Sequence, residues 1–242
     1  PGEATTNEFS AKVAQELGPA LKFPREVEEG PVRARLIQDP AVSPDGHRLA
    51  FSALTRLYVM DLPSGSPNSI LPEGRRAFQP SWSPDGASLV YATWSGGEGH
   101  IEKVSASGGA PERITRVAAF YSDPVWSPDG SRIVAPRARA HDRTTQQVDF
   151  GPPPGMDLVW IPAGGGDASL ILPARGLGKP HFGNDHERIF LYLTPPGFGD
   201  GADHGLVSLR FDGTDRRQHL KVVGPGIYKN QEPVGAEGGR LS

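Results

Sequence analysis

The sequence predicts an all-β fold, a β-propeller built from four-stranded antiparallel blades, and three observations carry this prediction. The turn Ser-Pro-Asp-Gly occurs three times, at residues 43–46, 83–86 and 127–130. Each copy is followed by a short apolar segment, and the aspartates of successive copies are 40 and 44 residues apart. That interval is the length of one propeller blade. We therefore expect each copy to mark the first hairpin of one blade.

The composition agrees with a fold rich in tight turns. The chain has 31 glycines and 25 prolines among 242 residues, and 36% of its residues are hydrophobic, which indicates turns between strands rather than disorder. A net charge of −3 gives no broad basic field, so nucleic acid and anionic membranes are not expected partners. Without cysteine, the chain has no disulfide and no thiolate metal site. No apolar run reaches the roughly 18 residues of a membrane span.

The aspartate of each turn has a geometric task. Proline supplies a φ near −65°, aspartate accepts hydrogen bonds from the backbone of its own turn, and glycine takes the positive φ that closes a hairpin. A degenerate fourth copy spans residues 182–189. We therefore interpret the four aspartates as structural turn residues rather than as a ring of functional carboxylates: Asp45, Asp85, Asp129 and Asp185.

The repeat divides the chain into about four blades, which should cover residues 37–76, 77–120, 121–176 and 177–222. In the first blade we expect strands at residues 41–43, 48–52, 57–62 and 69–71. In the second blade we expect them at residues 81–83, 88–93, 101–105 and 112–115. In the third and fourth blades the strands at 125–127, 132–135, 158–162 and 205–211 follow the same pattern.

Two insertions interrupt the repeat, at residues 137–156 and 195–204. Both lie between the second and third strands of a blade, so they should share one face, where long loops often carry function. Asp200, Asp203 and His204 in the second insertion are candidate ligands of a hard cation such as calcium. The alternative is a solvated acidic loop, and no other cofactor is expected.

The two ends of the chain do not follow the repeat. Residues 1–36 contain no turn motif, and within them 9–17 and 20–27 could each form a strand that closes the ring. A short helix at 10–17 is the alternative, because its apolar residues have helical spacing. Residues 240–242 match 41–43 and would start a further blade. We therefore expect the chain to be a fragment of a larger propeller.

The residue before each repeat proline varies, although its surroundings repeat. These residues are Asp39, Gln79, Asp123 and Lys179. If the first strand of each blade lines the central channel, the four polar side chains gather around one mouth of the channel, together with His181. Such a mouth could hold a peptide terminus or a metal ion. The alternative is a solvated rim without a ligand.

The sequence lacks the strings that mark common catalytic sites. It contains no Gly-x-Ser-x-Gly elbow of a serine hydrolase and no phosphate-binding Gly-x-x-x-x-Gly-Lys-Ser/Thr. Its seven histidines form neither His-Glu-x-x-His nor His-x-His, the spacings that present two imidazoles to one metal ion. We therefore predict no catalytic residues within these 242 residues.

The segments 40–46 with 49–51 and 57–62, then 80–86 and 124–130, resemble the TolB-type propeller repeat, which is WD40-like. Within the proteins that carry this repeat, the segments 9–38, 99–101 and 205–215 are most similar to the N-terminal propeller of secreted bacterial amidohydrolases. This resemblance implies a periplasmic or secreted location. It also implies that a metal-dependent catalytic barrel follows residue 242 in the parent protein.

The resemblance favours a non-catalytic scaffold that binds a protein, a peptide or the catalytic domain of its own chain. Two alternatives remain open at this point. One is a stand-alone TolB-like periplasmic interaction protein that binds its partner on one propeller face. The other is a propeller enzyme with a metal ion in the central channel.

Overall fold

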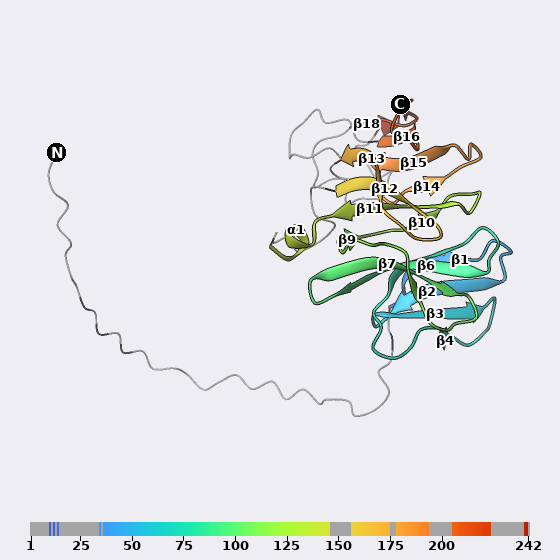
Figure 1. Cartoon of the computed structure of the whole chain (residues 1–242), viewed down its shortest axis with the longest axis vertical. Coiled ribbons are helices and arrows are strands. Elements are labelled where there is room, and N and C mark those ends of the chain that lie inside the picture. The colour runs from blue at the N-terminus through green and yellow to red at the C-terminus, as the bar shows by residue number, and fades with distance from the viewer. Residues whose placement is uncertain are drawn as a thin grey trace. The chain divides into compact units, whose positions relative to one another are not determined.

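A computed structural model describes residues 36–145, 156–174, 178–193, 205–223 and 240–241, and the single residues 10, 12, 14 and 34. Within these residues the chain forms four antiparallel four-stranded meanders, one of which carries an extra short strand. They are four blades of a β-propeller, as the sequence predicts. In Figure 1 the first two blades lie in the lower half of the propeller and the last two in the upper half.

The first blade consists of β1 (Gln38–Val42), β2 (Arg48–Ala53), β3 (Arg56–Asp61) and β4 (Asn68–Ser69). The second consists of β5 (Phe78–Trp82), β6 (Ser88–Ser95), β7 (Glu98–Ser105) and β8 (Glu112–Arg113). The third consists of β9 (Phe120–Tyr121), β10 (Val125–Trp126), β11 (Arg132–Ala138), β12 (Met156–Pro162) and β13 (Ser169–Ala174). The fourth consists of β14 (His181–Phe182), β15 (Arg188–Leu193), β16 (Gly205–Arg210) and β17 (Arg217–Gln218).

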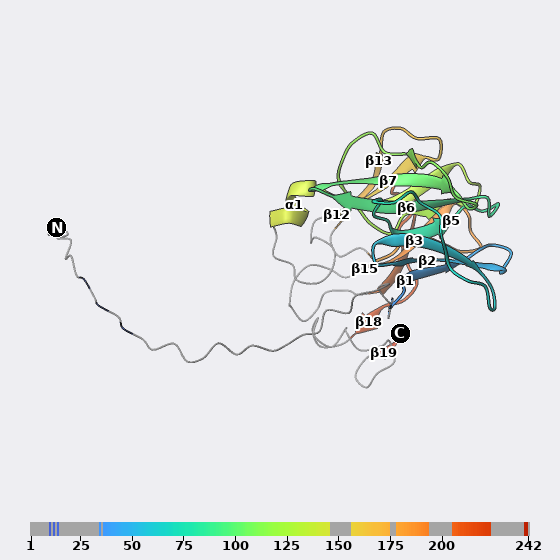
Figure 2. The same ribbon diagram turned by 90° about the horizontal axis from the view of Figure 1, so that it is seen from below.

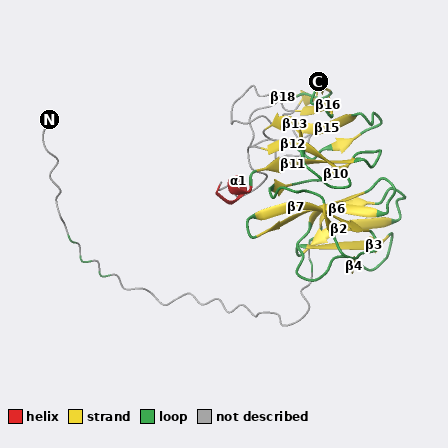
Figure 3. Ribbon diagram, in the orientation of Figure 1, coloured by secondary structure: helices red, strands yellow, loops and turns green. Residues whose placement is uncertain are grey.

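Outside the blades, the described residues form one helix, α1 (Ala140–Thr145), between β11 and β12 (Figure 3). β18 (Val222–Val223) pairs with β19 (Arg240–Leu241), which includes the residues expected to start a further blade. The strands or helix predicted at 9–27, and the second insertion at 195–204, fall almost entirely outside the described residues. No described helix is long and apolar enough to cross a membrane.

The Ser-Pro-Asp-Gly turns have one hydrogen-bond pattern. In the first turn Ser43 Oγ donates to Asp45 Oδ1 at 2.5 Å, and the backbone N–H of residue 47 donates to the same oxygen at 3.0 Å. The serine oxygen in turn accepts the N–H of Arg48, at 2.9 Å. The turns at 83–86 and 127–130 repeat these contacts. In the fourth copy, glycine replaces the serine, and the contact from the N–H of Glu187 to Asp185 remains at 3.1 Å.

The first strand of each blade is bulged at its proline. One extra residue is present on this strand, so that the pre-proline residue and the proline together face a single residue of the second strand. Asp39 and Pro40 face Phe51, Gln79 and Pro80 face Tyr91, Asp123 and Pro124 face Ala135, and Lys179 and Pro180 face Leu191. Because proline has no N–H to donate, a bulge is where a strand tolerates it.

The hydrophobic core lies between consecutive blades. One cluster joins the first and second blades around Leu57 and Leu89, and a second joins the second and third around Ile101 and Ile133. A third joins the third and fourth blades around Leu191. Among the described residues no such cluster joins the fourth blade to the first. Figure 2 shows the same sheets from below, with α1 beside the ends of β7 and β12.

The first insertion is shorter than the sequence predicts. β11 continues to Ala138, although we expected the strand to end at residue 135, before Pro136. Pro136 pairs with Leu158 of β12, and its carbonyl accepts the N–H of Ser122 at 3.1 Å. The third strand begins at Met156 rather than at residue 158. The loop therefore starts after residue 138, and part of it is the helix α1, which the sequence analysis did not predict.

Candidate functional site

Three of the pre-proline residues have a strained backbone. The φ angles of Asp39, Gln79 and Asp123 are +50°, +55° and +44°. For a residue other than glycine, this left-handed conformation costs roughly 1–2 kcal/mol. Strain of this kind persists where the surroundings enforce it, and it is concentrated at binding and catalytic sites. Its recurrence at one position of the repeat therefore directs attention to the start of the first strands.

The structure brings four of the five predicted channel-mouth residues near one another. The Gln79 side-chain oxygen accepts the backbone N–H of Asp123 at 2.9 Å, which links the second and third blades. The charges of Lys179 and Asp39 both act on the Asp123 carboxylate. His181 is different, because its exposed ring stacks on Phe190 of its own blade at 5.9 Å.

Among the predicted mouth residues, Asp123 has a shifted pKa. Burial raises the pKa of this carboxyl above its ordinary value, and the charge of Asp39 raises it further. Lys179 acts in the opposite direction and lowers the pKa. A carboxylate that is partly desolvated and also sits on a strained backbone lowers the stability of the folded chain, as side chains placed for function often do.

We expect the substitution Asp123→Asn to stabilise the chain at neutral pH, by about 0.5–1 kcal/mol. Because the folded-state pKa of Asp123 is raised, its carboxyl stabilises the fold at pH values below the unfolded pKa of 3.8. That stability is lost as the pH rises through the raised pKa. Asparagine avoids the loss and tolerates the left-handed backbone. Urea unfolding of Asp123→Asn and of the wild type measures the difference in their free energies of unfolding. This difference should be smaller at pH 3 than at pH 7.

Asp129→Asn is the matched control, because its carboxyl titrates in the opposite sense. Hydrogen bonds from Ser127 and Ser131 lower the pKa of Asp129 to about 2. Its stabilising effect is therefore present above the unfolded pKa of 3.8 and is lost as the pH falls toward 2. Asp129→Asn should destabilise the chain at pH 7. If Asp123→Asn also destabilised the chain at pH 7, the ionised Asp123 carboxylate would not lower the free energy of unfolding.

A cavity of about 420 Å³ opens beside the mouth residues. It is lined by Gln38, Asp39, Phe78, Gln79, Ala92, Thr93, Trp94, Phe120, Tyr121 and Arg143. Trp94 and Phe120 meet edge to face at 5.5 Å, and the Arg143 guanidinium of α1 lies 5.3 Å from the centre of the Phe120 ring. The first insertion thus supplies a cation to the edge of an aromatic cavity.

This arrangement is suited to binding a ligand. Ligand cavities are typically 300–1,000 Å³ in volume, mostly apolar, with a few polar groups that orient the ligand. Here four of the ten lining residues are aromatic, Gln79 and Asp39 offer side-chain oxygens, and Arg143 offers N–H donors. Among the described residues no three histidine, aspartate or glutamate side chains are grouped so that they could hold a metal ion. The predicted calcium ligands Asp200, Asp203 and His204 lie outside these residues.

Sequence reasoning missed Trp94, Phe120 and Arg143. Phe78 and Phe120 lie one and three residues before the pre-proline positions of their blades, and this proximity was the signal that could have indicated an aromatic wall. Arg143 lies in the first insertion, at residues 137–156, in which the sequence singled out no residue. Its approach to Phe120 depends on the position of α1, which no local pattern in the sequence reveals.

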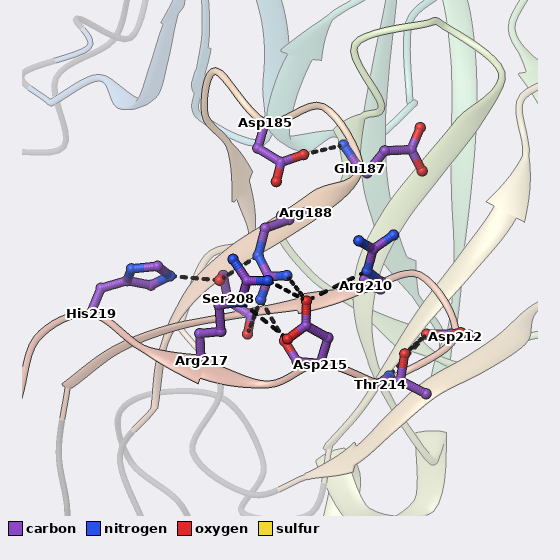
Figure 4. Close-up of polar contacts among 10 residues, drawn as sticks. All are labelled: Asp185, Glu187, Arg188, Ser208, Arg210, Asp212, Thr214, Asp215, Arg217 and His219. Atoms are coloured by element: carbon purple, nitrogen blue, oxygen red, sulfur yellow. Dashed lines mark hydrogen bonds and ion pairs between the residues drawn. The ribbon is translucent and has the colours of Figure 1, made fainter.

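A second polar cluster lies in the fourth blade and is built around Arg188, whose exposure is only 2% (Figure 4). Its guanidinium donates to Ser208 Oγ at 2.9 Å and to the Ser208 carbonyl at 3.2 Å. It also pairs with the Asp215 carboxylate at 2.6 Å and donates to the Asp215 carbonyl. His219 Nε2 lies 2.6 Å from Ser208 Oγ. Ser208 is fully buried, and its contacts with Arg188 link β15 to β16 within the blade.

Comparison with known families agrees with this geometry. Residues 33–151 match the model of the TolB beta propeller domain. This segment is a TolB-type β-propeller domain. It contains the first two blades and the strands β9, β10 and β11 of the third. Asp123 and Arg143 both lie within it.

Solved structures share the propeller fold at low sequence identity. TolB from Acinetobacter baumannii has a TM-score of 0.58 and 19% identity over 74% of this chain and 42% of its own. An oligogalacturonate lyase in complex with manganese has a TM-score of 0.55 and 20% identity, over 75% of this chain and 51% of its own. A puromycin hydrolase S511A mutant has a TM-score of 0.55 and 16% identity, over 76% of this chain and 28% of its own. These likenesses show the fold, and this chain spans about half or less of each protein.

Proposed function

We propose that this chain is a non-catalytic binding module, and that it holds the C-terminal end of a polypeptide in the cavity beside the channel mouth. The observation that carries the proposal is the composition of that cavity. Aromatic walls, side-chain oxygens and one arginine converge where three blades begin with a strained residue. The positive φ angles and the partly buried Asp123 carboxyl both lower the stability of the fold, and features of this kind are concentrated at binding sites.

The chemistry of the lining favours a particular kind of peptide. Trp94 and Phe120 form a surface on which an aromatic or other large apolar side chain can pack. The guanidinium of Arg143 forms no ion pair within the described part of the chain, so its fork of donors can bind a terminal carboxylate. Gln79 still has two amide hydrogens to donate to a peptide carbonyl.

The role of the module in a larger protein is part of the proposal. The resemblance to propellers of secreted amidohydrolases supports a hydrolytic parent, in which the propeller docks on the catalytic domain or presents a peptide to it. It also supports a periplasmic or secreted location. A puromycin hydrolase is among the structurally similar proteins, and the segment that matches this chain makes up only 28% of it.

Display of random peptides with free C-termini on the purified chain tests the proposal. We expect enriched peptides to end in a large apolar or aromatic residue. For the best peptide, measured by fluorescence anisotropy, Arg143→Ala should weaken binding about tenfold or more, because a hydrogen bond to a charged group contributes roughly 1.5–3 kcal/mol. Amidation of the peptide C-terminus should weaken binding to a similar extent.

Arg139→Ala is the matched control, since it removes the same charge just before α1 from an exposed position that does not line the cavity. It should leave the affinity within about twofold. Equal affinities of the wild type, Arg143→Ala and Gln79→Ala would show that the peptide binds elsewhere. Hydrolysis of peptide, amide or ester substrates that is abolished by a substitution in this chain would contradict the non-catalytic role.

A further inference from the structure

One position of the repeat is occupied by arginine in three blades and by serine in the second. It is the residue three places after the turn aspartate: Arg48, Ser88, Arg132 and Arg188. This residue opens the second strand of each blade, on the face of the propeller where the Ser-Pro-Asp-Gly turns lie. Consecutive strands of a meander run in opposite directions, so the connection that carries α1 lies on the opposite face.

At the junction of the first and second blades the arginine fills the space between them. Arg48 Nη2 donates to the Gly86 carbonyl at 2.8 Å, and its Cζ atom lies 4.7 Å from the centre of the Trp82 ring. Trp82 Nε1 donates to the Ala41 carbonyl at 2.9 Å. The guanidinium therefore has both a carbonyl acceptor and an aromatic face, and the indole N–H has an acceptor.

At the junction of the third and fourth blades the same position again places a guanidinium among aromatic rings. Arg132 Cζ lies 4.7 Å from the centre of the Trp160 ring and 4.6 Å from that of Phe211. Phe211 in turn stacks on Phe182, the residue equivalent to Trp82. A guanidinium against an aromatic ring is thus a repeated part of the contact between blades.

The junction of the second and third blades has a cavity of about 450 Å³ at this place. Its lining comprises Ser83, Pro84, Asp85, Ser88, Lys103, Trp126, Asp129, Gly130, Ala163 and Gly164. Trp126 and Gly130 occupy the positions that Trp82 and Gly86 occupy at the first junction. Ser88 is too short to reach them, and no arginine lies over the Trp126 ring within the described part of the chain. Trp126 Nε1 is buried there without a hydrogen-bond acceptor.

The charges around this cavity favour a cation. Hydrogen bonds from Ser83 and Ser127 lower the pKa values of Asp85 and Asp129, so both carboxylates are ionised at neutral pH. The one cation in the lining, Lys103, is already paired with Glu112 at 2.9 Å and lies 3.5 Å from the Ala163 carbonyl. The remaining charge of the lining is therefore negative.

We propose that this cavity binds the guanidinium of an arginine side chain presented by a partner polypeptide. The guanidinium takes the place that Arg48 occupies at the first junction, over the Trp126 ring and within reach of the Gly130 carbonyl. The cavity is larger than a guanidinium alone, so it also admits the alkyl stem. The backbone that carries the arginine brings carbonyl oxygens, the kind of acceptor that Trp126 Nε1 lacks.

The four indole N–H signals of the ¹⁵N-labelled chain provide a direct test, because the chain has four tryptophans. Titration with N-acetyl-L-arginine methylamide should shift one indole signal saturably, and Trp126→Phe should remove that signal. The citrulline analogue has the same shape without the charge and should produce less than a tenth of the shift. Ser88→Arg should abolish the shift, because it fills the cavity from within, and it should raise Tm by a few degrees.

Arg48→Ser extends the test by creating an equivalent cavity at the first junction. The same probe should then shift a second indole signal, that of Trp82, which is lost in Trp82→Phe. If Ser88→Arg failed to fold, this gain of a second site would still decide the question. The proposal is overturned if citrulline and arginine probes shift the Trp126 signal equally, if Ser88→Arg leaves the shift unchanged, or if Arg48→Ser gains no site.

Discussion

Replacement of Arg188 by methionine is expected to lower the free energy of unfolding by about 3 kcal/mol, because two oxygens of the buried Ser208 and two of Asp215 lose the same hydrogen-bond donor at once. The guanidinium is buried and serves the Ser208 hydroxyl, the Ser208 carbonyl and two oxygens of Asp215. Methionine keeps the length of the side chain but donates no hydrogen bond. For a chain of this size, Tm should fall by roughly 6–12 °C.

Two features keep the expected loss from being larger. The Asp215 side chain remains partly solvated, and Arg217 stays paired with it at 2.8 Å. Ser208 Oγ also keeps its contact with His219. The carboxylate is therefore not left as an isolated buried charge, whereas the carbonyl oxygen of the fully buried Ser208 loses its guanidinium donor in a place that water does not reach easily.

Arg217→Met is the control that isolates the effect of burial. Arg217 contacts the same carboxylate, but its side chain is 57% exposed, and exposed ion pairs contribute at most about 1 kcal/mol. Urea unfolding curves of both variants and of the wild type, compared at equal pH and salt, measure the difference. Similar losses for the two variants would mean that the Arg188 cluster is not a structural anchor of the fourth blade.

The blade architecture could be predicted from the sequence because its signals are local. Each Ser-Pro-Asp-Gly turn fixes a hairpin through contacts between residues no more than five positions apart, such as Ser43 with Asp45 and Arg48. The apolar segments that follow then form the second strand. The bulge at each proline was not predicted, although the proline was visible, since it becomes apparent only when the strand is paired with its neighbour.

The candidate site was harder to predict because its parts come from several blades. The varied polar residues before the prolines indicated Asp39, Gln79 and Asp123, and the structure places these near one another. His181 was grouped with them by its position in the sequence, and its ring stacks on Phe190. The aromatic wall and Arg143 depend on how α1 and the neighbouring blades meet. Contacts of this kind have no local signature.

Gly99 shows how closely the backbones of two blades approach beneath the aromatic cavity. It lies in β7, and its carbonyl accepts the N–H of Ala119, just before β9, at 3.0 Å. A Cβ atom at this position would lie 2.5 Å from the Ala119 carbonyl oxygen and 2.7 Å from that of Thr93. It would also lie 2.8 Å from the Trp94 ring. Two of these neighbours are backbone atoms, which cannot move aside as a flexible side chain can.

Gly99→Ala is therefore expected to destabilise the chain by about 3 kcal/mol, at the upper end of the usual cost of overpacking. The second and third blades must separate to admit the methyl group, and Thr93 and Trp94 move with them. Peptide binding in the cavity should weaken in parallel. Thermal unfolding measures the first effect, with an expected fall in Tm of roughly 6–12 °C. Fluorescence anisotropy at a temperature where the variant remains folded measures the second.

Gly164→Ala adds the same methyl group where no atom lies within 4 Å and where no positive φ is required, so its Tm should stay within about 2 °C of the wild type. The comparison separates a steric effect from the effect of alanine on the unfolded chain, which both variants share. A Gly99→Ala chain as stable as the wild type would show that the two blades can separate at little cost. A destabilised Gly99→Ala chain that binds the peptide with unchanged affinity would instead place the peptide away from Trp94, because the wall of the cavity cannot shift without altering what it holds.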